Sequence, residues 1–112
     1  MSIVLSEKES LFTLYTKTSM YQMKVDDYGV LLHTYYGKKT ENFDYSYLIQ
    51  RRDHGFSGNP YQAGNDRTYS LDTLPQEYSC FGSGDYRQSA LSVKYQTAAM
   101  ALELRYKDYE IQ

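Results

Sequence analysis

Residues 11–36 read LFTLYTKTSMYQMKVDDYGVLLHTYY, and this stretch decides the fold. Two segments alternate in side-chain type. One face is expected to carry Phe12, Leu14 and Thr16, then Tyr21, Met23 and Val25, and the other face Thr13, Lys17, Gln22 and Lys24. A period of two is typical of half-buried β-strands. The turn-forming run 26–29 (DDYG) is followed by a strand-like segment from Val30 to Tyr36, so the sequence predicts an antiparallel hairpin.

The C-terminal quarter repeats the alternation. Leu91, Val93 and Tyr95 form one set and Leu102, Leu104 and Tyr106 another, which predicts two further strands. A helix over residues 97–107 is the competing interpretation, because Ala, Met, Leu and Glu are good helix formers. Together these segments favour an all-β fold, an antiparallel β-sandwich of which this chain forms part.

Composition limits the function. The chain has 112 residues, 14 of them tyrosine, and a net charge of -2, so it is a single domain or part of one. The charge balance argues against binding nucleic acid by counterion release, and no apolar run is long enough to span a membrane. The single cysteine, Cys80, rules out an internal disulfide and suggests a reducing, cytoplasmic location. His33, His54 and Cys80 match no zinc spacing, so we expect no metal site and no cofactor.

A long loop region, residues 37–88, separates the two alternating parts. It holds six of the seven glycines and both prolines, and shows no long periodic run. Loops of this length are usually binding loops or disordered linkers. The region is rich in aromatic side chains that we expect to be packed: Phe43, Tyr45, Tyr47, Phe56, Tyr61, Tyr69, Tyr78, Phe81 and Tyr86.

Three groups of polar residues in this loop region are candidates for chemistry. The first is 51–60 (RRDHGFSGNP), which suits a polyhydroxylated ligand, although Arg51 or Arg52 pairing with Asp53 on the surface is the simpler interpretation. The second is 65–68 (NDRT), either a binding fork or an ordinary loop cap. In the third, Asp72 and Glu77 form an acid and base pair or fix backbone amides.

Two longer motifs make the sequence recognisable. Residues 66–90, DRTYSLDTLPQEYSCFGSGDYRQSA, resemble the N-terminal signature of the bacterial α-galactosidases of glycoside hydrolase family 36. Residues 11–39 resemble the first strands of the same family, and the similarity runs in order from about Leu11 to Ile111. Departures from the family pattern occur at Ser79, at Gly58 and in the turn at 97–100.

The resemblance implies a larger enzyme. Family members have an N-terminal β-sandwich, a (β/α)₈ barrel that supplies both catalytic aspartates, and a small C-terminal β domain. They hydrolyse terminal α-galactosides such as melibiose and raffinose with retention, and members form tetramers. This chain would be the first part of the sandwich, residues 1–112, with no catalytic residue and no activity alone. Asp53 and Arg67 match positions that shape the galactose pocket.

An incomplete sandwich would also affect assembly. Uncovered sheet edges predict self-association, so we expect a homo-oligomer. The alternative function is a free-standing carbohydrate-binding or protein-interaction module that uses the same aromatic loops without a barrel.

Overall fold

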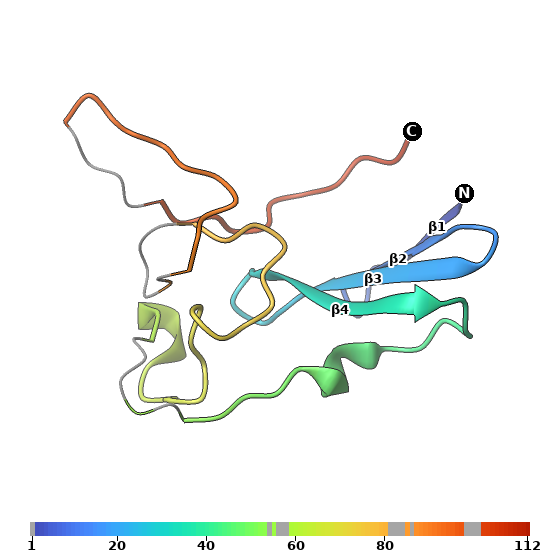
Figure 1. The fold of residues 1–112 in the computed structure, drawn as a ribbon, viewed down its shortest axis with the longest axis horizontal. Helices are drawn as coiled ribbons and strands as arrows, with labels where there is room; N and C mark the ends of the chain where they lie inside the picture. The colour runs from blue at the N-terminus through green and yellow to red at the C-terminus, as the bar shows by residue number, and fades with distance from the viewer. Residues whose placement is uncertain (1, 54, 56–58, 81–84, 86, 98–101) are drawn as a thin grey trace.

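A computed structural model describes residues 2–53, 55, 59–80, 85, 87–97 and 102–112 (Figure 1). Its only sheet among these residues is antiparallel, and its four strands are β1 (Ser2–Ser6), β2 (Leu11–Tyr15), β3 (Ser19–Val25) and β4 (Leu31–Lys38). They neighbour one another in sequence order, β1-β2-β3-β4. Two 3-10 helices follow, η1 (Tyr45–Leu48) and η2 (Tyr61–Ala63). The predicted all-β, antiparallel class is confirmed.

The hairpin of β3 and β4 forms where the sequence predicts it. Val25 pairs with Leu31, and the Asp26 carboxylate closes the turn by accepting hydrogen bonds from the backbone N–H groups of Tyr28 and Val30, both at 2.9 Å. Gly29 has φ +79°, in the left-handed region that a side chain disfavours. The turn residues therefore set the register of the pair.

Both faces of the sheet are covered, and the face with polar side chains is the more deeply buried. Thr13 and Gln22 are fully buried and Thr34 nearly so. The Gln22 side chain donates to Phe43 O (2.7 Å) and to Thr13 Oγ1 (3.3 Å), and its Oε1 accepts from Thr34 Oγ1 (2.9 Å) and from Tyr45 N (3.0 Å). All four hydrogen-bonding positions of this amide are filled, so Gln22 attaches the segment around η1 to the sheet, together with Thr13 and Lys24.

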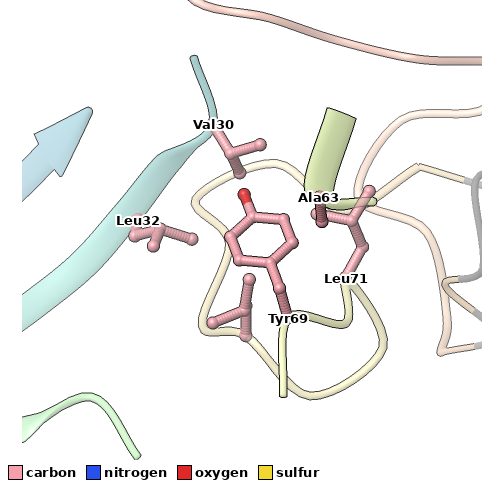
Figure 2. Packing of buried hydrophobic residues seen from close by; sticks show 6 residues of the cluster. Val30, Leu32, Ala63, Tyr69 and Leu71 are labelled. Carbon is pink, nitrogen blue, oxygen red and sulfur yellow. The ribbon is translucent and has the colours of Figure 1, made fainter. Parts of the chain in front are cut away.

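The main apolar cluster lies where the irregular segment meets the start of β4. Figure 2 shows the Tyr69 ring among its neighbours; the buried members are Val30, Leu32, Ala63, Tyr69, Leu71 and Leu74. The expected packing of loop aromatics is right for Tyr69, which is 2% exposed, and wrong for Tyr61 and Tyr78, which are 96% and 62% exposed. Phe43 and Tyr47 contact each other but remain 61% and 68% exposed. Phe56, Phe81 and Tyr86 lie outside the described residues.

The two strands predicted near the C-terminus are wrong. Residues 92–95 and 102–112 have no regular structure, so the alternative helix is also absent from 102–107, while 98–101 lie outside the described residues. An alternating sequence becomes a strand only beside a partner. Here Leu91 makes a single bridge to Cys80, and Tyr106 N donates to Gly29 O at 2.7 Å.

The C-terminal segment nevertheless packs against the sheet. It runs back toward the end of the sheet that carries the N-terminus (Figure 1). Phe12 of β2 contacts the rings of Tyr106 and Tyr109 at centroid distances of 6.0 and 5.6 Å, and the Tyr109 hydroxyl donates to Glu7 at 2.9 Å.

Across the described ranges, no helix has the length and apolar character needed to cross a membrane.

Candidate functional site

The first two groups of polar loop residues come together, and their charges pair across the loop. Arg51 Nη2 lies 2.5 Å from Asp66 Oδ2, and Arg67 Nε lies 3.4 Å from Asp53 Oδ2. The pairing of Arg51 with Asp53 considered from the sequence is therefore not the arrangement found. Segments 51–53 and 66–67 are joined by two ion pairs, of which Asp53 and Arg67 form the outer one.

The outer pair is exposed and is organised by a glycine. Asp53 Oδ1 accepts a hydrogen bond from Gly55 N at 2.8 Å, and Arg67 Nη2 donates to Gly55 O at 2.8 Å. Gly55 has φ +79°. The side chains of Arg67 and Asp53 are 61% and 48% exposed, so they present donors and an acceptor side by side to the solvent. His54 and residues 56–58 lie outside the described residues.

The inner pair has closer contacts. Asp66 Oδ1 accepts from Thr68 N at 3.0 Å and from Thr68 Oγ1 at 2.5 Å, which confirms the loop-cap interpretation of this residue. These hydrogen bonds and, to a smaller degree, Arg51 hold the pKa of Asp66 below its usual value. The Arg51 guanidinium lies over the ring of Tyr69, 5.1 Å from its centre.

Tyr69 connects this inner pair to the hairpin. Its hydroxyl donates to Asp26 Oδ2, the carboxylate that also closes the β3–β4 turn. Burial and the bond to Asp26 raise the pKa of Tyr69 well above its usual range. A cavity of about 180 Å³ lies between the hairpin, η1 and Arg51; Asp53 and Arg67 are not among its lining residues. The outer pair is thus a surface feature.

In the third group, Glu77 attaches the loop to two strands. Glu77 Oε1 accepts from the Tyr21 hydroxyl of β3 at 2.5 Å, and Glu77 N donates to Leu31 O of β4 at 3.0 Å. Burial, followed by Glu77, raises the pKa of Tyr21 to about 12.

Sequence reasoning overlooked the best-partnered carboxylate, Asp85, which is 2% exposed. It accepts from Gln76 Nε2 at 2.7 Å and from the backbone N (3.0 Å) and Nε (3.1 Å) of Arg87. Arg87 Nη2 in turn donates to Leu71 O at 2.6 Å and Leu74 O at 2.9 Å. The two halves of the signature, SLDTLPQEY and GDYR, are therefore bound to each other. The Asp-x-Arg spacing was the available signal.

The described residues include no group of three or more His, Cys, Asp or Glu side chains that could hold a metal ion. Cys80 is free and buried. Burial raises the pKa of its thiol, and the charge of Asp85 adds to this. A thiol with a raised pKa is a poor nucleophile.

Comparison with known proteins identifies the family. Residues 29–112 match the glycosyl hydrolase family 36 N-terminal domain. The bifunctional alpha-galactosidase/sucrose kinase AgaSK of Mediterraneibacter gnavus is 51% identical over 111 residues, which cover 99% of this chain and 12% of that protein. Alpha-galactosidase Mel36A of Lactobacillus acidophilus is 36% identical over 110 residues, covering 98% of this chain and 15% of that protein.

Solved structures show the same similarity in three dimensions. The galactosidase domain of AgaSK gives a TM-score of 0.92 at 50% identity and covers 97% of this chain and 15% of that one. Family 36 α-galactosidase AgaB from Geobacillus stearothermophilus gives 0.82 at 36% identity, covering 96% and 14%. Because the family model matches most of the sequence and the fold agrees, this chain belongs to glycosyl hydrolase family 36 as part of its N-terminal domain.

Proposed function

We propose that this chain is the first part of the β-sandwich domain of a retaining α-galactosidase, inactive alone, and that Asp53 and Arg67 lie at the rim of the galactose pocket. The observation that carries the proposal is the exposed Asp53–Arg67 pair at 3.4 Å, on a chain 51% identical to a relative named as an α-galactosidase. The chain spans only 12% and 15% of the two relatives described, and the proposal places the bond-breaking carboxylates outside these 112 residues.

The chemistry of the pair suits a sugar. A carboxylate accepts hydrogen bonds from hydroxyl groups, while a guanidinium donates to their oxygen atoms, so the two together can grip neighbouring hydroxyls of one ring. Asp53 Oδ1 accepts from Gly55 N and Oδ2 faces Arg67 Nε at 3.4 Å, and each oxygen has a second acceptor position that a sugar hydroxyl can use. Such contacts orient the terminal galactose, while proton transfer and covalent chemistry take place elsewhere.

The relatives suggest which substrate to test. Family 36 α-galactosidase AgaA from Geobacillus stearothermophilus has been solved with raffinose and, separately, with stachyose. We therefore propose raffinose and melibiose as substrates of the complete protein.

We also propose that the complete protein is a cytoplasmic homo-oligomer, a tetramer. Support comes from β1, the edge strand of the sheet, where Ile3 and Val4 are 39% and 41% exposed. An exposed apolar edge strand is a template for association. Light scattering coupled to size-exclusion chromatography measures the assembly, and a monomeric complete protein would contradict this part.

The decisive experiment compares Asp53→Asn with Arg52→Gln in the complete enzyme, using raffinose. Arg52 is an exposed neighbour and serves as the matched control. We expect Asp53→Asn to raise KM about tenfold, the effect of losing a charge-assisted hydrogen bond, with kcat little changed and the control unaltered. Loss of kcat with assembly intact would show that positioning is the wrong role.

The isolated chain provides the second test. It should not hydrolyse an artificial α-galactoside. Turnover by the 112 residues alone would overturn the assignment, whereas calorimetric binding of raffinose by the chain alone, abolished by Asp53→Asn, would favour a free-standing carbohydrate-binding module.

A further inference from the structure

Among the described residues, the outer pair is held only by its own contact and by two hydrogen bonds to Gly55. Asp53 and Arg67 meet at 3.4 Å with side chains that are 48% and 61% exposed. Exposed ion pairs of this kind are weak, since water competes for both charges. A binding rim needs its groups fixed to a fraction of an ångström, so something beneath the pair must position it.

The inner pair is attached to the folded core. The side chains of Arg51 and Asp66 are 42% and 38% exposed, so the anchor is not burial of the ion pair itself. Arg51 meets Asp66 at 2.5 Å, and its guanidinium lies over the ring of Tyr69, which is 2% exposed. The Tyr69 hydroxyl is bound to Asp26 in the β3–β4 turn. The Arg51 guanidinium is therefore held by the Tyr69 ring and by the Asp66 carboxylate. Arg51 comes two residues before Asp53 in the chain.

Asp66 fixes the other side of the loop. Its Oδ1 caps Thr68, and its carbonyl oxygen accepts from Asn59 Nδ2 at 2.5 Å and from Tyr69 N at 3.2 Å. The residue next in the chain is Arg67. Each member of the inner pair thus lies one or two residues from a member of the outer pair.

We propose that Arg51 and Asp66 are positioning residues for the Asp53–Arg67 rim pair. The proposal deepens the function proposed above and rests on it. Asp66 acts in two ways. Through the Thr68 cap it fixes the backbone next to Arg67, and its Oδ2 engages the Arg51 guanidinium, which is then not available to pair with Asp53 in place of Arg67.

The chain offers a control with nearly the same chemistry. Asp44 also caps the residue two positions on, accepting from Ser46 N at 2.9 Å, and it also pairs with a cation, Lys24, at 2.7 Å. The Lys24–Asp44 pair joins β3 to η1 and, among the described residues, contacts neither Asp53 nor Arg67. Asp66→Asn and Asp44→Asn therefore remove the same charge from the same kind of cap at two places.

The test measures KM and kcat on raffinose for both variants in the complete enzyme, with Asp53→Asn alongside. We expect Asp66→Asn to raise KM about fivefold at unchanged kcat, and Asp44→Asn to lower thermal stability without moving KM. Arg51→Lys, which keeps the charge and loses the fork, should give an intermediate KM. In the double variant Asp53→Asn/Asp66→Asn, the second change should add nothing.

A readout independent of activity is limited tryptic cleavage after Arg67. We expect Asp66→Asn to accelerate this cleavage and Asp44→Asn to leave it unchanged. If Asp53→Asn raises KM but Asp66→Asn does not, the positioning role is wrong while the rim proposal stands. If neither changes KM, the proposed rim itself fails. If Asp66→Asn and Asp44→Asn have equal effects on KM and cleavage, Asp66 is only a structural cap and the inference is overturned.

Discussion

The sheet and the irregular segment of this chain are held together by different means. Residues 2–38 form four strands in which backbone groups bond to backbone groups in a regular register. Beyond Lys39, the described residues rely on carboxylates that each gather several donors, as Asp66 and Asp85 do. Four charged residues of the family signature, Asp66, Glu77, Asp85 and Arg87, therefore hold an irregular backbone in place through their side chains.

The largest effect is expected at Asp85. Asp85→Ala leaves the Arg87 side chain and Gln76 Nε2 without their common acceptor in a site where the carboxylate is 2% exposed. We expect a loss of about 3 kcal/mol in the free energy of unfolding, measured by urea denaturation. Asp108→Ala, at an exposed position, is the control. Equal stability of the two variants would show that the irregular segment does not depend on its carboxylates.

Gln22 makes one of the contacts between the two regions, and we expect the second largest effect there. Gln22→Leu keeps the volume but removes the bonds to Phe43 O and Tyr45 N, leaving the latter without its side-chain acceptor. We expect a cost of about 2 kcal/mol in the free energy of unfolding. A variant as stable as the parent would mean that η1 is held by other contacts.

Alkaline unfolding sharpens the comparison. The pKa of Tyr21 is raised from 10.0 to about 12, so the folded state keeps its proton where the unfolded state loses it. Stability from this group is complete below pH 10 and falls between pH 10 and about 12. In Tyr21→Phe the melting temperature should decline less steeply across this window. An unchanged slope would assign the alkaline loss to Tyr69, whose pKa is also raised.

The smallest effect is expected on acid unfolding, through the Lys24–Asp44 pair. Burial opposes ionisation of Asp44, but the hydrogen bonds from Lys24 and Ser46 outweigh it and lower its pKa below 3.8. The resulting stability is present above that value and is lost as the pH falls through the folded pKa. Lys24→Met should remove part of this loss, about 0.5 kcal/mol for a partly exposed pair. Melting temperatures from pH 5 to pH 2 measure it.

The hairpin could be predicted because its signals are local. Alternation over a few residues and the run DDYG determine both strands and the turn between them. The strand β1 was missed, although Ile3, Val4 and Leu5 suit a strand, because charged residues follow at once. The strands predicted at 91–95 and 102–106 are wrong although their alternation is clear. Among the described residues, no neighbouring strand pairs with them.

The candidate site was only partly predictable. Its residues were identified, but its pairing was not, since Arg51 and Asp66 are 15 positions apart and no spacing rule joins them. The role of Asp85 was missed for a similar reason. Burial depends on what folds over a residue, and Leu71 and Leu74 are brought to Arg87 by a loop without periodicity.

The order β1-β2-β3-β4 also bears on synthesis. Because neighbours in the sheet are neighbours in the chain, all four described strands are available for pairing once Lys38 has left the ribosome. The signature residues that stabilise the irregular segment are synthesised later and can pack on a sheet that has already formed, as expected for proteins that fold from the N-terminus during translation. Nascent chains stalled after residue 80 should already protect the β3–β4 hairpin from protease; cleavage there would show that the sheet waits for the remainder.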